Sequence, residues 1–209
     1  MAYFYLLTLL FTKMDKPIFS PFDKTIVLAS KSPRRAQLLK DAGFTFRIHL
    51  MDVNEDFPAD LQPDQVAMFL ANKKAAAADV HQLEEKEVLL TADSVVIIHD
   101  KILNKPTDFN EAHQMLSILS GQNHKVYTGV CLQSKTRKII LNSETTVHFG
   151  TLAEEEISYY LEKYKPFDKA GSYGIQDWIG YCKIKKIEGE YANVMGLPIF
   201  DIYQALLDF

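Results

Sequence analysis

Cysteine, tryptophan and long runs of like charge are all scarce in this chain. The 2 cysteines, Cys131 and Cys182, stand in no Cys-x-x-Cys or Cys/His pattern, which argues against a structural zinc site and against a disulfide framework. Such cysteine usage suits a reducing compartment, so we expect the cytoplasm. The net charge is −4 and no long basic run appears, so nucleic acid is not an expected partner.

Long hydrophobic runs are also lacking. The apolar stretch "MAYFYLLTLLF" (1–11) has roughly half the ~20 residues that a membrane-spanning helix needs, so no membrane association is expected. It has neither a basic leader nor a small-x-small cleavage pattern, which argues against a secretory signal. Met14 is an alternative start. We therefore expect residues 1–23 to be an extension, explained by a misassigned start, and residues 24–209 to form a single domain.

From residue 24 onward, strand-like and helix-like segments alternate, which is typical of an α/β protein. Strands are expected at 25–29, 45–53, 87–103 (with a hairpin around 99–100), 124–134 and 138–150. Helices are expected at 33–42, 63–83, 109–120, 153–164 and 199–208. No repeat or low-complexity linker divides these elements.

Four polar residues gather where the first expected strand meets its helix. The stretch "IVLASKSPRR" (26–35) contains Lys31, Ser32, Arg34 and Arg35. A helix N-terminus presents free N–H groups and the positive end of the helix dipole, so positive side chains there cost about 0.3–1 kcal/mol each unless an anion binds. The pattern indicates a phosphate site, although a solvated helix start with surface arginines has the same sequence. It is not a Walker A loop.

An acidic residue interrupts the most apolar strand. Asp93 lies in "LLTADSVVII" (89–98), and a carboxylate buried there is costly unless it is paired, hydrogen-bonded or bound to metal. A turn aspartate that accepts from its own backbone is the plainer alternative. Glu55 is a candidate partner after the second strand, although Asp52 and Asp56 compete with it.

Two lysines and one glycine-rich region complete the candidates. Lys74 lies in the alanine-rich helix and Lys105 in "ILNKPTD" (102–108); each alone is equally typical of a surface charge. "AGSYGIQDWIG" (170–180), which contains Gln176, and "EGEYANVMGLP" (188–198) suit a base or sugar pocket. A hairpin with core aromatics explains these segments equally well. No GxSxG, HExxH or GxGxxG motif is present.

Taken together, these segments resemble the Maf family of nucleoside triphosphate pyrophosphatases. The matching pieces follow one another over residues 25–205, and they are "LASKSPRR" (28–35), Glu55, "NKKA" (72–75), "ADSVV" (92–96), "LNKPTD" (103–108), "TGV" (128–130), "DKAGSYGIQ" (168–176) and "NVMGLP" (193–198). The resemblance implies a mixed-sheet, two-lobed α/β fold similar to inosine triphosphate pyrophosphatase, with a cleft between the lobes. It also implies a hydrolase acting on acid anhydrides that releases a nucleoside monophosphate and pyrophosphate, cleansing nucleotide pools.

The resemblance assigns roles to ten residues. The implied catalytic residues are Asp93 as proton acceptor, Glu55, Lys74 and Lys105. The implied substrate-binding residues are Ser30, Ser32, Arg34 and Arg35, and the implied specificity residues are Arg34, Ser94 and Gln176. Glu55 and Asp93 are the implied ligands of a divalent cation, Mg²⁺ or Mn²⁺, because Mg²⁺ takes one or two carboxylates with phosphate oxygens and water.

The sequence departs from the family pattern at three places. In the family, an Arg, Thr, Gln set at the positions of Arg34, Ser94 and Gln176 is associated with a dTTP/UTP branch. Ser94 stands where threonine is usual, and because serine keeps the hydroxyl, the resemblance still implies that branch. "QDWIG" (176–180) replaces a glycine after the glutamine, which is expected to alter the base pocket through Trp178. "HDKILNKP" (99–106) lacks a glycine, which is expected to affect only a hairpin turn. The alternative function is a nucleotide-binding regulator of septum formation that does not turn substrate over; a homodimer is compatible with either.

Overall fold

The computed structural model describes residues 23–209, so the expected extension at 1–23 lies outside the described residues except for its last position. The strands are β1 (Thr25–Leu28), β2 (Phe46–Ile48), β3 (Glu87–Ile98), β4 (Lys101–Leu103), β5 (Asn123–Gln133), β6 (Lys138–Phe149) and β7 (Ile184–Glu188). The α-helices are α2 (Pro33–Asp41), α3 (Pro63–Ala76), α4 (Phe109–Leu119), α5 (Glu154–Tyr164), α6 (Trp178–Lys183), α7 (Tyr191–Met195) and α8 (Ile199–Leu207). In this part of the chain no helix is long and apolar enough to cross a membrane.

The strands form one mixed sheet, as expected for an α/β fold. Its order is β2-β1-β3-β5-β6-β7, with β4 beside β3. β1 pairs in parallel with β2 and β3, while β3, β5, β6 and β7 pair antiparallel. The sheet therefore has a short parallel part at one side and long antiparallel strands that run the length of the molecule.

One edge of β3 is left without a partner at its centre. β1 pairs with residues 87–90 of β3, and β4 pairs with residues 96–98 on the same side. On the opposite side β5 accompanies β3 continuously from Leu89 to Ile97. Among the described residues no strand covers residues 91–95 of β3 on the first side, and this gap is where the cavity described below opens.

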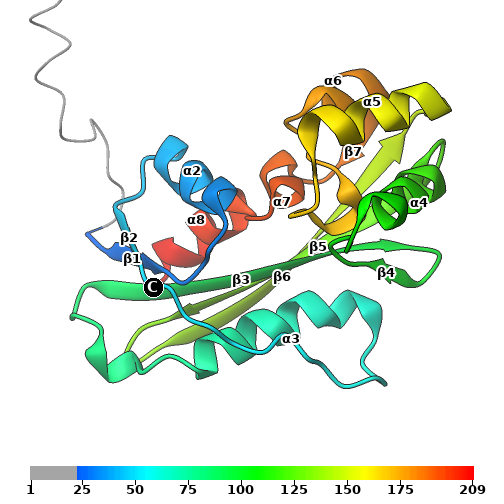
Figure 1. Cartoon of the computed structure of the whole chain (residues 1–209). Helices are drawn as coiled ribbons and strands as arrows, with labels where there is room; N and C mark the ends of the chain where they lie inside the picture. Colours follow the sequence, from blue (N-terminus) through cyan, green and yellow to red (C-terminus); the bar gives the residue numbers. More distant parts are fainter. Residues whose placement is uncertain (1–22) are drawn as a thin grey trace, which may run out of the picture.

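Helices cover both faces of the sheet and build two lobes on one of them. α3 lies along one face (Figure 1), where it packs against β3 and β5. On the other face, α2 and α8 cover the half near β1 and β2, which we call the first lobe. α4, α5 and α6 cover the opposite half, which we call the second lobe. The strands β3 and β5 pass through both halves, so the two lobes share one sheet.

Several expected elements differ in length from the observed ones. The strand expected at 45–53 is only Phe46–Ile48, because the chain beyond it leaves the sheet and crosses toward α3. The helix expected to run to residue 83 ends at Ala76. The hairpin at 99–100 is present, and His99 and Asp100 supply its positive φ values of 49° and 59° where many chains use glycine. The short helices α6 and α7 were not expected from the sequence.

Gly129 in β5 allows α3 to lie unusually close to the sheet. A Cβ atom at this position would lie 2.3 Å from the backbone carbonyl carbon of Ala67 in α3. Gly129 is paired with Asp93 across the β3–β5 ladder, so the close approach occurs beside the candidate catalytic aspartate. The glycine of the "TGV" segment is therefore required by packing, and it brings α3 within reach of Asp93.

We expect Gly129→Ala to lower the free energy of unfolding by about 3 kcal/mol or more, because the new methyl group can be accommodated only by moving α3 backbone. Urea unfolding measures the loss. Gly43→Ala is the control: Gly43 has φ +77°, and no atom lies within 4 Å of the position that the new methyl group would take, so only backbone strain of about 1 kcal/mol is expected. Equal losses in both variants would contradict the packing argument.

A buried histidine–tyrosine pair supports the second lobe. His124 is 2% exposed, and its Nε2 lies 2.7 Å from the hydroxyl oxygen of Tyr173. Both rings contact Phe149 in edge or tilted arrangements. Burial, with a smaller contribution from His148, lowers the pKa of His124 from 6.5 to about 3, so the imidazole is neutral in the folded protein at physiological pH.

This pKa predicts acid sensitivity above the range in which carboxylates titrate. Between pH 6.5 and 3, His124 is protonated in the unfolded chain but neutral in the folded protein. The contribution of neutral His124 to the free energy of unfolding is therefore complete above about pH 6.5 and decreases as the pH falls. From about pH 7 to about pH 5 we expect a loss of about 2 kcal/mol. His124→Gln keeps a hydrogen-bonding group without titrating, and its urea midpoint should lack this part of the pH dependence. Parallel curves for both proteins would contradict the assignment.

Candidate active site

A cavity of about 980 Å³ opens beside residues 92–96 of β3, and residues of both lobes line it. All ten residues singled out in the sequence line it, and they come from several segments that are distant in the sequence. These are Ser30, Ser32, Arg34, Arg35, Glu55, Lys74, Asp93, Ser94, Lys105 and Gln176. The volume and the mixture of charged and polar groups suit a ligand with several anionic groups.

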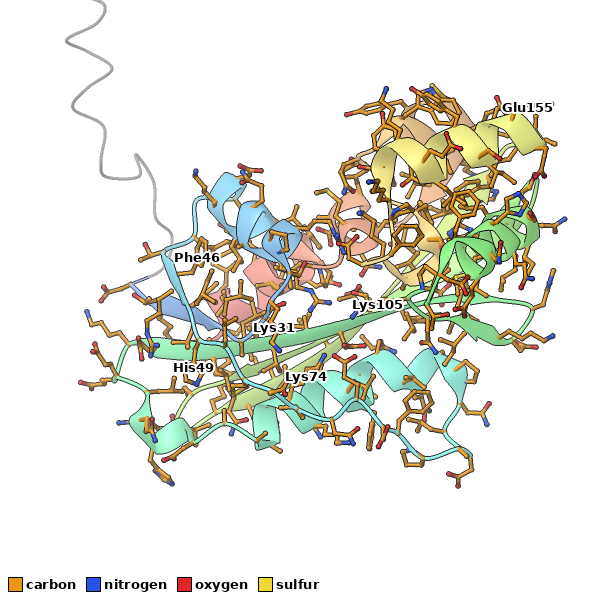
Figure 2. The ribbon with its side chains drawn as sticks, in the orientation of Figure 1. Lys31, Phe46, His49, Lys74, Lys105 and Glu155 are labelled. Atoms are coloured by element: carbon orange, nitrogen blue, oxygen red, sulfur yellow. The ribbon has the colours of Figure 1, made fainter. Side chains whose placement is uncertain are left out.

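The ammonium group of Lys74 joins two carboxylates at the centre of this cavity. Lys74 lies on α3, and its Nζ is 2.5 Å from Oδ1 of Asp93 and 2.7 Å from Oε1 of Glu55. The Lys74 and Asp93 side chains are only 16% and 14% exposed. Figure 2 shows Lys74 between α3 and β3. Asp93 is therefore the paired carboxylate that its apolar strand requires, rather than a turn residue that accepts from its own backbone.

The structure distinguishes among the three acids that follow β2. Asp52 contacts Lys31 at 3.1 Å, with both side chains largely exposed. Asp56 accepts from Lys73 only through its backbone oxygen. Glu55 alone of the three makes the contact with Lys74. Burial acts to raise the pKa of Glu55, but the positive charges of Lys74, Lys105 and Arg35 outweigh it, so the pKa lies below its usual value. The Glu55 carboxylate is therefore ionised at neutral pH.

Ser94 points to the face of β3 opposite Asp93, because side chains alternate along a strand. Its hydroxyl lies 2.9 Å from that of Thr128, the directly paired residue on β5. Thr128 in turn donates to the backbone oxygen of Asn193 in α7. The fully buried Asn193 side chain donates to backbone oxygens of β5 and β6. The segments "TGV" and "NVMGLP" thus hold α7 against the sheet beside Ser94.

Arg35 uses most of its hydrogen-bonding capacity within the protein. Its guanidinium makes four hydrogen bonds, to the backbone oxygens of Gly196 and Ala92 and the hydroxyls of Ser30 and Ser94. A guanidinium has only five N–H donors. Arg35 therefore ties α2 to β3 and to the segment after α7, and little of it is left for a ligand.

Arg34 reaches across the cavity to the second lobe. Its Nη1 lies 2.6 Å from Oδ2 of Asp168, in the loop that follows α5. Asp168 also accepts from Lys169; burial raises its pKa, but Lys169 and Arg34 together hold that pKa below its usual value. Ser32 occupies the N-cap position of α2, but its side chain makes no capping hydrogen bond. The first turn of α2 therefore carries two arginines and no acid, which is the arrangement that an anion stabilises.

The donor set is compatible with a divalent cation that arrives with its ligand. Among residues 23–209 no group of three or more His, Cys, Asp or Glu side chains is placed to hold a metal ion. Glu55 and Asp93 nevertheless converge on a single positive charge, that of Lys74. Two carboxylates match Mg²⁺, which completes its shell with phosphate oxygens and water. Lys105 lies near these groups on the side of the second lobe (Figure 2), where its charge acts on Glu55.

Gln176 lies in the cavity wall, whereas Trp178, which was expected to alter the base pocket, does not line the cavity. The Trp178 ring packs edge-on against Tyr159 of α5, with ring centroids 5.4 Å apart, and it joins the core of the second lobe. The expectation that this tryptophan alters the base pocket is therefore wrong. Trp178 is the first residue of α6, its ring contacts Tyr159, and it is not among the residues that line the cavity.

Sequence reasoning missed two sets of site residues. Asp168, which holds Arg34, was visible only as the first letter of "DKAGSYGIQ" (168–176). Thr128 and Asn193 were noted within motifs, yet their hydrogen bonds join β3, β5 and α7, which are distant in the sequence. A lone acid in a loop or a lone threonine in a strand carries no signal of its own, because its partner is chosen by the fold.

The chain is similar to known proteins over most of its length. The family model described as Maf-like protein matches residues 25–209. A protein named dTTP/UTP pyrophosphatase from Porphyromonas gingivalis (strain ATCC 33277) is 47% identical over 186 residues, 88% of this chain and 94% of the relative. One with the same name from Flavobacterium psychrophilum is 46% identical over 188 residues, 90% of this chain and 96% of the relative. A third, from Bacteroides fragilis (strain ATCC 25285), is 44% identical over 182 residues, 87% of this chain and 94% of the relative.

Among solved structures, the Staphylococcus aureus Ham1 protein aligns with a TM-score of 0.44 at 12% identity, covering 60% of this chain and 72% of its own. The family model and the curated relatives each span most of the described residues. This chain therefore belongs to the Maf family.

Proposed function

We propose that this protein hydrolyses nucleoside triphosphates, with dTTP and UTP as its preferred substrates, to a nucleoside monophosphate and pyrophosphate. The observation that carries the proposal is the Lys74 ammonium held between Glu55 and Asp93, facing a cationic helix start in one cavity. A triphosphate carries close to four negative charges, so attack on it requires neutralisation and orientation. The names of the relatives support this reaction and these substrates.

The charged groups divide the work of binding between the two lobes. The N-terminus of α2, with Ser32 and Arg34, offers N–H donors from the first lobe, and Lys105 offers an ammonium from the second. Lys74 binds phosphate oxygens while it continues to orient Asp93. Arg35 and Ser30 act mainly through each other, since the Arg35 guanidinium is occupied by protein acceptors.

Asp93 supports the chemical step. Its free oxygen orients a water molecule and accepts a proton from it as the water oxygen bonds to the α-phosphorus. The bond between the α-phosphorus and the bridging oxygen to the β-phosphorus breaks, and pyrophosphate leaves. A divalent cation, Mg²⁺ or Mn²⁺, held by Glu55 and Asp93, would neutralise phosphate charge when bound. The two cysteines are free thiols, which is consistent with a reaction that takes place in the cytoplasm.

We expect Asp93→Asn to reduce pyrophosphate release about 1000-fold, because the amide cannot accept the proton. The fold should be retained, since Glu55 still pairs with Lys74. Asp100→Asn is the matched control: Asp100 is exposed at the β3–β4 turn, and asparagine accepts its positive φ. Chromatographic separation of pyrophosphate from phosphate provides the measurement. Substantial pyrophosphate release by the Asp93 variant would exclude Asp93 as the base, and orthophosphate as the sole product would exclude the reaction.

We expect chelation of divalent cations to abolish turnover, and Mg²⁺ or Mn²⁺ to restore it, because the carboxylates of Glu55 and Asp93 repel the phosphates unless a cation lies between them. A panel of dTTP, UTP, CTP and GTP assayed with each metal measures both metal dependence and preference. dTTP and UTP should have the highest kcat/KM values. Full activity in EDTA would contradict the role of the metal, and equal turnover of all four nucleotides would contradict the substrate assignment.

A further inference from the structure

The turn that carries Gln176 is closed on itself beside the cavity. The backbone N–H of Asp177 donates to the oxygen of Gly174 at 3.0 Å, and both Gly174 and Gln176 line the cavity. A Cβ on Gly174 would lie 2.6 Å from Oδ2 of Asp177 and 2.9 Å from Nε2 of Gln176. Both side chains therefore fold over Gly174, and the Asp177 carboxylate lies on the same side as the amide nitrogen of Gln176.

The buried hydroxyl of Tyr160 holds both ends of this turn. It donates to Oδ2 of Asp177 at 2.7 Å and accepts from the N–H of Gly174 at 3.0 Å. A phenol has one donor and two acceptor positions, so it makes both bonds at once. Tyr160 is fully buried on α5 and is absent from the cavity lining. Burial, followed by Asp177, raises the pKa of the phenol, so it is a permanent donor.

The orientation of the Gln176 amide decides which base edge it can read. A carboxamide carries a donor and an acceptor that exchange places when the group rotates by half a turn. Thymine and uracil present an N3–H donor beside the O4 acceptor, whereas cytosine presents an N3 acceptor beside an N4 donor. A freely rotating glutamine would serve both. A glutamine fixed in one orientation binds only one kind of base, because the other kind would leave polar groups of the site unpaired.

The surroundings of Gln176 favour one orientation. The negative Asp177 carboxylate attracts Nε2 and repels Oε1. Oε1 is shielded from water and accepts no hydrogen bond from any described residue. Because Oε1 is closed off in this way, Nε2 is the atom of the amide that remains for a ligand, and it would donate to O4 of thymine or uracil but would meet the N4 donor of cytosine.

We propose that Tyr160 is a positioning residue for base selection: through Asp177 and Gly174 it fixes the Gln176 carboxamide in the orientation that accepts thymine and uracil and excludes cytosine. This inference rests on the proposed function and adds a specific cause for its pyrimidine preference. It concerns a residue that does not touch the substrate.

The test compares Tyr160→Phe with Tyr164→Phe. The two tyrosine rings stack on each other, with centroids 5.1 Å apart, and no described residue hydrogen-bonds to the Tyr164 hydroxyl. Each variant loses one hydroxyl from the same pair of rings, so Tyr164→Phe controls for effects on packing. In Tyr160→Phe the ratio of kcat/KM for dTTP to that for dCTP should fall roughly tenfold, the worth of about one hydrogen bond. KM for dTTP should rise while kcat changes less than about twofold.

A purely structural role would lower stability or reduce both activities together, and would leave the ratio unchanged. A wild-type ratio in folded Tyr160→Phe, or equal falls in both variants, would overturn the inference. If Tyr160→Phe does not fold, Asp177→Asn provides the same test, because its amide no longer favours Nε2 over Oε1.

Calorimetric binding of UMP and CMP separates this inference from the proposed function. If the wild-type protein turns over no triphosphate, the proposed function fails. The ratio of the Kd for CMP to the Kd for UMP still tests Tyr160. This ratio should be roughly tenfold smaller in Tyr160→Phe than in the wild type. An unchanged ratio overturns the inference whatever the turnover.

Discussion

The site depends on the interrupted pairing of β3. One long strand is bordered by β1 at its start and by β4 at its end, and among the described residues no strand pairs with residues 91–95 on that side. β5 covers the other side without a break, so the strand stays rigid. A rigid strand with one open edge places side chains of both its faces at the rim of the same cavity. The two lobes need no hinge to form this arrangement, because they share the strand.

The charges in this cavity are balanced within the protein before any ligand binds. Lys74 joins Glu55 and Asp93, Arg34 joins Asp168, and each pair links segments that are distant in the sequence. Ion pairs of this kind compensate the desolvation of the partly buried groups. They also hold the cations in fixed orientations before a ligand binds. The close approach of α3 at Gly129 supplies the geometry for the first of these sets.

The sequence was sufficient for the order of elements, because strand and helix patterns depend on local residues. The sequence also allowed the ten candidate residues to be assigned to one site, because their motifs follow one another in the order of the family, and all ten line one cavity. What it could not give were contacts chosen by the fold. Nothing near Arg35 indicates that Gly196 and Ala92 would take its donors, and nothing in "QDWIG" indicates that Trp178 would pack on Tyr159. Short helices such as α6 lack the length over which periodicity is detectable.

The alternation of side chains along β3 separates the two tasks of the proposed enzyme. Asp93 faces α3 and its lysine, while Ser94, one residue later, faces α2, α7 and the Arg35 network. Adjacent residues thus belong to different groups of contacts. Asp93 belongs to the ion pairs of Lys74, and Ser94 belongs to the hydrogen bonds of Arg35 beside the start of α2. Gln176 and its support by Tyr160 come from the second lobe, away from the Lys74 set. In the proposed reaction, a substitution at Tyr160 would therefore change which base is accepted without disturbing Asp93, because the hydrogen bonds of the Tyr160 hydroxyl stay within the second lobe.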